Sequence, residues 1–140
     1  MNDPSAALSL ELLGASSSVE ARLEAALEPL GLSLAKFGAL SRLVAAGEPL
    51  PLSTLAERCA CVRSNITQLV DRLEAENLVT RIHDPHDRRS IRAELTEEGR
   101  RRQSEGGRAI QEAEAEIFAK VPPKERGSLR QLLRSLRGTC

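Results

Sequence analysis

Two adjacent arginines, Arg88 and Arg89, lie in the polar segment 84–90 (DPHDRRS). The Asp-Pro pair that opens this segment favours a turn between two strands. Guanidinium groups bind phosphates strongly, and they also suit the narrow, electronegative minor groove of a DNA duplex. Two arginines at the tip of such a turn therefore indicate contact with duplex DNA.

A second candidate surface lies just upstream, on a helix predicted over residues 63–77. Apolar residues recur there at three- and four-residue spacing and would share one buried face. The opposite face would be polar near the helix N-terminus, which suits a helix whose first turns enter a major groove. An ordinary solvated face would have the same polarity, so the neighbouring arginines decide in favour of DNA. The candidate base and phosphate contacts are Arg63, Ser64, Asn65, Thr67 and Gln68, with Arg72 expected at the DNA backbone.

The elements that must position these residues follow in a recognisable order. We expect a short helix over 53–59, a turn at 60–62, the helix over 63–77, and a hairpin with strands at 79–83 and 90–95. In the second strand Ile91, Ala93 and Leu95 alternate with polar residues, as in a half-buried strand. This order predicts a winged helix-turn-helix in a mostly α protein with a small β-hairpin wing.

The segments 84–90 (DPHDRRS) and 95–100 (LTEEGR) closely resemble the wing signature of the MarR family of bacterial transcriptional regulators. The segment 73–81 (LEAENLVTR) is similar to the end of that family's recognition helix, with Asn77 where glycine is usual. Asparagine tolerates the left-handed conformation that ends a helix. The resemblance runs from about Leu8 to Leu136, and its specific part is the wing motif.

The resemblance implies a homodimer with two winged lobes that reads a pseudo-palindromic site in double-stranded DNA. It places Arg89 in the minor groove, held by Asp87, with Arg88 beside it. Family habit alone favours a repressor over an activator. It also implies a small-molecule pocket, although a fully packed junction is an equally good interpretation. The pocket walls would include Leu23, Leu27, Phe37, Leu40 and Ile110.

The terminal segments carry apolar stripes that the compact winged core has little surface to cover. We therefore assign residues 1–32 and 97–140 to a helical dimerisation region and residues 33–96 to the winged helix-turn-helix, within one compact domain. The first segment is either one helix or two with a break near Ser16–Ser18, and Gly106-Gly107 predicts a bend or close approach in the helix after Thr96. The stripes comprise Leu8, Leu12, Ala15, Val19, Leu23 and Leu27, and Leu129, Leu132, Leu133 and Leu136.

Composition sets the outer bounds. The chain has 140 residues, two phenylalanines as its only aromatic residues, and a formal net charge of zero. Neutral charge argues at first against a nucleic-acid partner, yet residues 79–92 hold four arginines and two aspartates. No apolar run of membrane length and no leader pattern is evident, so we expect a cytoplasmic protein with no membrane partner.

Enzymatic activity is not expected, because the sequence has no phosphate-binding glycine loop and no nucleophile-base arrangement. No cofactor is implied, and the histidines near the wing are not expected to hold a metal. Cys59 and Cys61 flank the turn before the recognition helix and could sense oxidants, but packing of Cys59 as a small apolar residue is the simpler interpretation. The alternative to DNA binding is a protein-interaction module built on the same fold.

Overall fold

The computed structural model describes residues 4–59 and 63–137, with side chains for 7–59 and 65–137. Its elements confirm the predicted class, a mostly helical protein with one small sheet. In chain order they are α1 (Pro4–Leu27), the 3-10 turn η1 (Glu28–Leu30), α2 (Leu34–Ala46), β1 (Leu50–Pro51), α3 (Leu52–Arg58), α4 (Arg63–Ala75), β2 (Val79–His83), β3 (Ile91–Leu95), α5 (Glu97–Ile117) and α6 (Pro123–Leu136).

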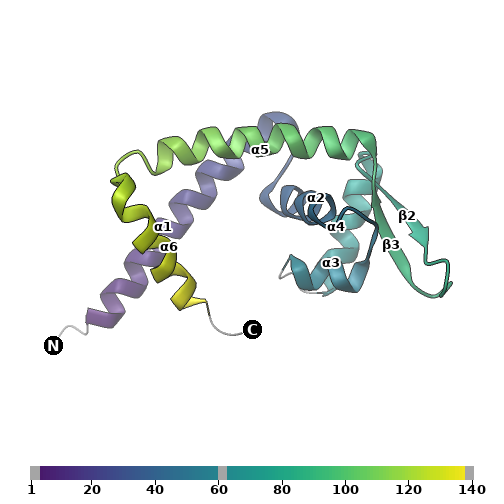
Figure 1. Cartoon of the computed structure of the whole chain (residues 1–140), viewed down its shortest axis with the longest axis horizontal. Helices are drawn as coiled ribbons and strands as arrows, with labels where there is room; N and C mark the ends of the chain where they lie inside the picture. The colour runs from purple at the N-terminus through teal and green to yellow at the C-terminus, as the bar shows by residue number, and fades with distance from the viewer. Residues whose placement is uncertain (1–3, 60–62, 138–140) are drawn as a thin grey trace.

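The long helix α5 joins two groups of elements (Figure 1). At one end α1 and α6 lie near both chain termini, and at the other end α2, α3, α4 and the sheet form the winged lobe. Helix α1 packs along α5, whereas α6 makes few contacts with the other described elements. The winged lobe is therefore the compact part of the chain, and the terminal helices extend from it.

The sheet has three antiparallel strands in the order β1-β3-β2. Strands β2 and β3 pair from Val79↔Leu95 to His83↔Ile91, and β1 adds the pair Leu50↔Ala93. Ala93 is fully buried at the centre of the sheet, as its alternation predicts. Ile91 was expected on the same buried face but is 37% exposed, because the hairpin extends beyond the helices that cover its base (Figure 1).

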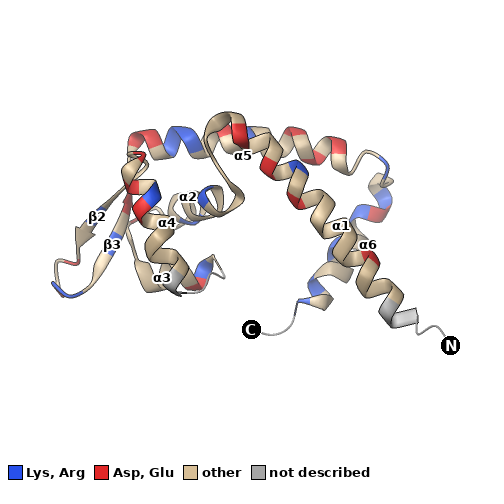
Figure 2. Ribbon diagram, turned by 180° about the vertical axis from the view of Figure 1, so that it is seen from behind, with Lys and Arg blue, Asp and Glu red and all other residues tan. Residues whose placement is uncertain are grey.

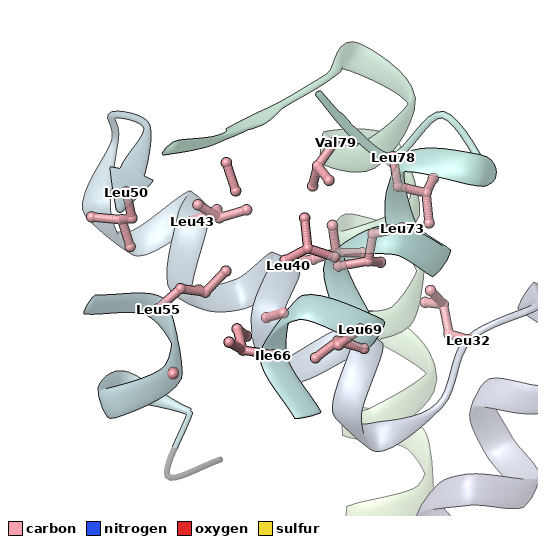
Figure 3. Packing of buried hydrophobic residues seen from close by; sticks show 14 of the residues in the cluster. Leu32, Leu40, Leu43, Leu50, Leu55, Ile66, Leu69, Leu73, Leu78 and Val79 are labelled. Atoms are coloured by element: carbon pink, nitrogen blue, oxygen red, sulfur yellow. The ribbon is translucent and has the colours of Figure 1, made fainter. Parts of the chain in front are cut away.

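The hydrophobic core lies inside the winged lobe and is built almost wholly from leucine, valine and alanine (Figure 3). Leu40 of α2, Leu55 of α3 and Leu73 of α4 have no exposed surface, and Leu27 brings the end of α1 into the same cluster. Phe37 packs against the cluster only in part. Burying these side chains fixes α4 against α2 and α3, since each fully buried leucine contributes about 2 kcal/mol.

Local signals in the sequence set several element ends. The Ser33 side chain accepts the Lys36 N–H at 3.2 Å and begins α2, which ends at Gly47 with φ 67°. Asn77 adopts φ 60°, which confirms the left-handed exit expected from α4. The suggested break near Ser16–Ser18 does not occur, and α1 is one continuous helix.

Gly106 lies where α5 closely approaches Leu32 and Phe37. A Cβ at this position would lie 2.8 Å from the Phe37 ring and 3.0 Å from a Leu32 methyl group, whereas a Cβ at Gly107 would meet nothing within 4 Å. The close approach expected at this glycine pair is therefore confirmed at Gly106. Among the described residues, no helix is long and apolar enough to cross a membrane.

Candidate nucleic-acid interface

The wing, comprising β2, β3 and the turn 84–90, is shaped by two aspartates that bind backbone N–H groups. Asp84 Oδ1 accepts the His86 N–H at 2.8 Å, and Asp87 Oδ1 accepts the Arg89 N–H at 3.0 Å. The Ser90 N–H donates to the Asp87 carbonyl at 3.0 Å and closes a tight turn around Arg88 and Arg89. Aspartate is favoured at the first position of such turns for this reason. Both arginines are thereby placed at the tip.

The guanidinium groups of Arg88 and Arg89 are exposed and make no hydrogen bond or ion pair within the described part of the chain. Asp87 contacts Arg89 through the backbone N–H, so it fixes the turn and leaves the guanidinium group available. Figure 2 shows the resulting positive charge at the tip of the wing. The predicted pair of arginines thus lies together, on a hydrogen-bonded turn, with no internal partner in the described chain.

Arg92 supports the wing from its base. Its Nη2 lies 2.8 Å from Asp84 Oδ2, and its Nε also donates to that oxygen at 3.1 Å. The pKa of Asp84 is held below its ordinary value, first by the His86 N–H and then by Arg92. Arg92 is therefore a structural cation, and its charge does not add to the positive tip.

Helix α4 exposes the polar face that the sequence predicts. Asn65, Thr67, Gln68 and Arg72 are exposed. The opposite face is buried through Ile66, Leu69, Val70 and Leu73. Arg63 and Ser64 begin the helix, but their side chains lie outside the described residues. The described candidates are all exposed, away from the buried face of the helix.

Arg81 of β2 is the interface residue whose role sequence reasoning missed. It counted as one of four cations near the wing, but its guanidinium group pairs with Asp71 at 2.5 Å and Glu74 at 3.0 Å. Burial opposes the charged form, yet the hydrogen bonds and charges of Asp71 and Glu74 outweigh it and raise the pKa of Arg81. The free positive charge of the wing is therefore concentrated in Arg88 and Arg89.

The two candidate surfaces lie on one side of the molecule. In Figure 1 the start of α4, beside α3, and the tip of the wing both lie on the lower side of the winged lobe, away from α5. Figure 2 shows the same arrangement from behind. A helix end and a cationic loop that project in one direction can contact the groove and the backbone of one duplex.

The residues expected around a ligand pocket include several that are packed in the core. Leu27 and Leu40 have no exposed surface, and Phe37 and Ile110 pack against the same core. A hollow of about 850 Å³ lies elsewhere, between α1, the end of α5 and α6. Its lining includes Leu12, Phe118, Leu129, Leu133, Arg130 and Arg134.

Cys59 ends α3 and packs partly buried against the core, as a small apolar residue would. Cys61, its proposed partner in oxidant sensing, lies outside the described residues. No group of three or more potential metal ligands occurs among the residues that the structure describes.

Comparison with known proteins gives consistent matches. Residues 32–91 match the sequence model of the MarR family. The chain is 34% identical over 92 residues to the transcriptional repressor MdtR of Bacillus subtilis, an alignment that covers 66% of this chain and 59% of MdtR. The alignments with two further B. subtilis regulators span less than half of those proteins.

Two solved structures extend the similarity to nearly the whole chain. A MarR-family regulator from Rhodococcus sp. RHA1 is 27% identical, with a TM-score of 0.85 over 97% of this chain and 96% of its own. An Escherichia coli MarR mutant complexed with operator DNA is 21% identical, with a TM-score of 0.86 over 94% of each chain, and it shows the shared fold. These proteins are transcriptional regulators rather than enzymes.

Proposed function

Because this chain belongs to the MarR family, we propose that it regulates transcription by binding a pseudo-palindromic site in double-stranded DNA as a homodimer. The wing would place Arg89 in the minor groove, with Arg88 at the adjacent phosphates. The start of α4 would read the major groove through Asn65, Thr67 and Gln68.

The main support for this proposal is the state of the two arginines at the tip of the wing. Arg88 and Arg89 have no internal partner in the described chain, although nearby carboxylates neutralise Arg81 and Arg92. Guanidinium groups that a rigid turn presents to solvent, on the side where α4 begins, are well placed for a duplex. This local arrangement matters more for DNA binding than the zero net charge of the chain.

The dimer is supported by the distribution of exposed apolar residues. Among the side chains that the structure describes, the large apolar ones at least 37% exposed are Ile91 and seven leucines, and these leucines lie on α1 and α6. They are Leu8, Leu10, Leu12, Leu13, Leu132, Leu133 and Leu136. A second copy would cover this surface, and the acidic residues of α1 would face the arginines of α6.

Repression is the regulatory direction we propose, since MdtR is a repressor and steric blocking of a promoter needs no further surface. Release by a small effector or by oxidation of Cys59 is a further hypothesis. An effector at Leu27 and Leu40 must displace packed side chains, since neither has exposed surface.

Enrichment of bound sequences from a random duplex library tests the proposed function. We expect a two-fold symmetric consensus with half-site centres about one helical turn, roughly 10 base pairs, apart. Recovery of unrelated sequences would contradict specific binding and favour the alternative, a protein-interaction module. Recovery of single half-sites would contradict the dimer.

A further inference from the structure

Arg81 joins the wing to the recognition helix through one side chain. It lies in the middle of β2 and faces α4. Its Nη1 donates to Glu74 Oε1 at 3.0 Å, and its Nη2 donates to Asp71 Oδ1 at 2.5 Å and to the Thr67 carbonyl at 3.3 Å. Its backbone N–H also donates to Glu74 Oε2 at 3.0 Å. All of the acceptors belong to residues of α4, namely Thr67, Asp71 and Glu74.

The three acceptors lie along one side of α4. Thr67, Asp71 and Glu74 are separated by four and three residues, so they follow one another on a single helix face. One guanidinium group therefore binds three acceptors, which come from residues that span two turns of the helix. The side chain of Arg81 is 22% exposed, compared with 60% for Asp71 and 41% for Glu74.

We propose that Arg81 is a positioning residue for DNA binding, which fixes the rotation of α4 relative to the wing. This inference rests on the proposed function. Packing of Leu69 and Leu73 sets which face of α4 enters the core, but these apolar contacts do not hold β2 to the helix by directional bonds. The fork of hydrogen bonds from Arg81 is directional, and β2 continues to the tip that carries Arg88 and Arg89.

The charges around Arg81 separate this role from direct DNA contact. One arginine and two carboxylates leave the cluster at one negative charge, so it has no surplus positive charge to attract a phosphate. Removing Arg81 would both free the helix and expose two carboxylates near the DNA. A neutral version of the cluster distinguishes these two effects.

The experiment measures affinity for the selected duplex and for nonspecific DNA over a salt series. The variants are Arg81→Gln, Arg81→Lys, and the triple variant Arg81→Gln/Asp71→Asn/Glu74→Gln. We expect Arg81→Gln and the triple variant to lose about tenfold or more in specific affinity, as when one base contact is misaligned. Arg81→Lys should recover part of this loss, and nonspecific affinity should keep the salt slope of the wild type.

Arg101→Gln is the matched control, because Arg101 also pairs with two carboxylates, Glu98 and Glu105, but on α5. It should bind the selected duplex as the wild type does. Thermal unfolding of every variant checks the fold. If Arg81→Gln unfolds, Asp71→Asn replaces it, because this variant removes one ion pair of Arg81 and keeps the pair with Glu74. We expect Asp71→Asn to show a smaller loss of specificity in the same direction.

Three results would overturn the inference. Wild-type affinity in the triple variant would show that Arg81 only screens the two carboxylates. A salt slope that falls by about 0.9 in Arg81→Gln would show a lost phosphate contact. Unchanged specific affinity in Arg81→Gln would show that Arg81 does not position α4 for DNA binding. Failure of the wild type to bind any duplex specifically would instead reject the proposed function.

Discussion

At the tip of the wing, the contacts of two carboxylates determine which charged residues shape the turn and which are available to a ligand. Asp84 and Asp87 accept backbone N–H groups and shape the turn, while Arg92 pairs with Asp84 at its base. Arg88 and Arg89 are left for a ligand. Segment 84–90 therefore contains both the aspartates that form the turn and the two arginines that it exposes.

Arg89→Ala tests the role of the tip. We expect weaker binding to all duplexes and a salt dependence that is flatter by about 0.9 per lost phosphate contact, with the dimer retained. Arg108→Ala, which removes an exposed arginine on α5, is the matched control and should leave both quantities unchanged. Equal affinities for Arg89→Ala and the wild type would show that the tip of the wing does not bind DNA through Arg89.

Asp84 gives the wing a defined response to acid. Because the pKa of Asp84 is lowered in the folded state, its contribution to stability is present above the ordinary carboxyl pKa and is lost as pH falls through the lowered value. In an NMR titration, the His86 amide, which donates to Asp84, should shift with a midpoint below about 3.9. Asp84→Asn should abolish this transition, and its persistence in the variant would assign it to another group.

At this scale the sequence predicted the arginine pair and the exposed face of α4, because turn-forming residues and helical periodicity are local signals. The pairing of Arg81 with Asp71 and Glu74 was missed. It depends on how β2 lies against α4, which is a tertiary relation that neither segment encodes alone. The positive charge of the wing could therefore be located only once these pairs were known.

Among the elements, the junction between the wing and α5 is the tightest. The Thr96 side chain accepts the Gly99 N–H at 2.9 Å and begins α5. Gly99 lies so close to the start of β2 that an added Cβ would be 2.0 Å from the carbonyl oxygen of Leu78, the residue before the strand. A backbone atom cannot move away as a flexible side chain can, so glycine is required here for space.

Gly99→Ala should therefore lower the free energy of unfolding by about 3 kcal/mol through overpacking. Gly107→Ala is the control in the same helix, where a Cβ would meet nothing within 4 Å, and it should be neutral or stabilising by up to about 1 kcal/mol. Chemical denaturation measures both changes. Equal effects of the two substitutions would contradict the close approach at Gly99.

Element ends were predictable where a cap or a proline marks them, as at Ser33, Gly47 and Thr96. Helix α5 ends at Ile117, before the prolines at positions 122 and 123. Arg126 donates to the carbonyls of Phe118 and Val121 and so stabilises the turn into α6. That contact joins α6 to the loop before it, which explains why helical propensity did not reveal it.

At the scale of the whole molecule, the winged lobe has a buried core but the terminal helices do not. Leu132 is 64% exposed and Leu133 43% exposed, and α6 makes few contacts with the other described elements. Exposed apolar surface of this kind indicates an interface. The apolar stripes predicted part of this surface from sequence, because helical spacing of apolar residues is a local signal.

The double variant Leu132→Asp/Leu133→Asp should dissociate the proposed dimer, because it places two charges in an apolar contact. Light scattering measures the mass, and circular dichroism checks that the winged lobe remains folded. Gln131→Asp/Ser135→Asp adds the same charge elsewhere on α6 and should remain dimeric. A folded Leu132→Asp/Leu133→Asp dimer would show that this stripe faces elsewhere.

The central claim is sequence-specific binding to duplex DNA, and a gel-shift assay with DNA flanking the protein's own gene tests it most directly. The assay uses excess nonspecific competitor and a salt series. We predict a discrete complex that resists the competitor and weakens steadily as salt rises, since phosphate contacts release counterions. The absence of a complex, or its equal loss for every DNA fragment as salt increases, would contradict the claim.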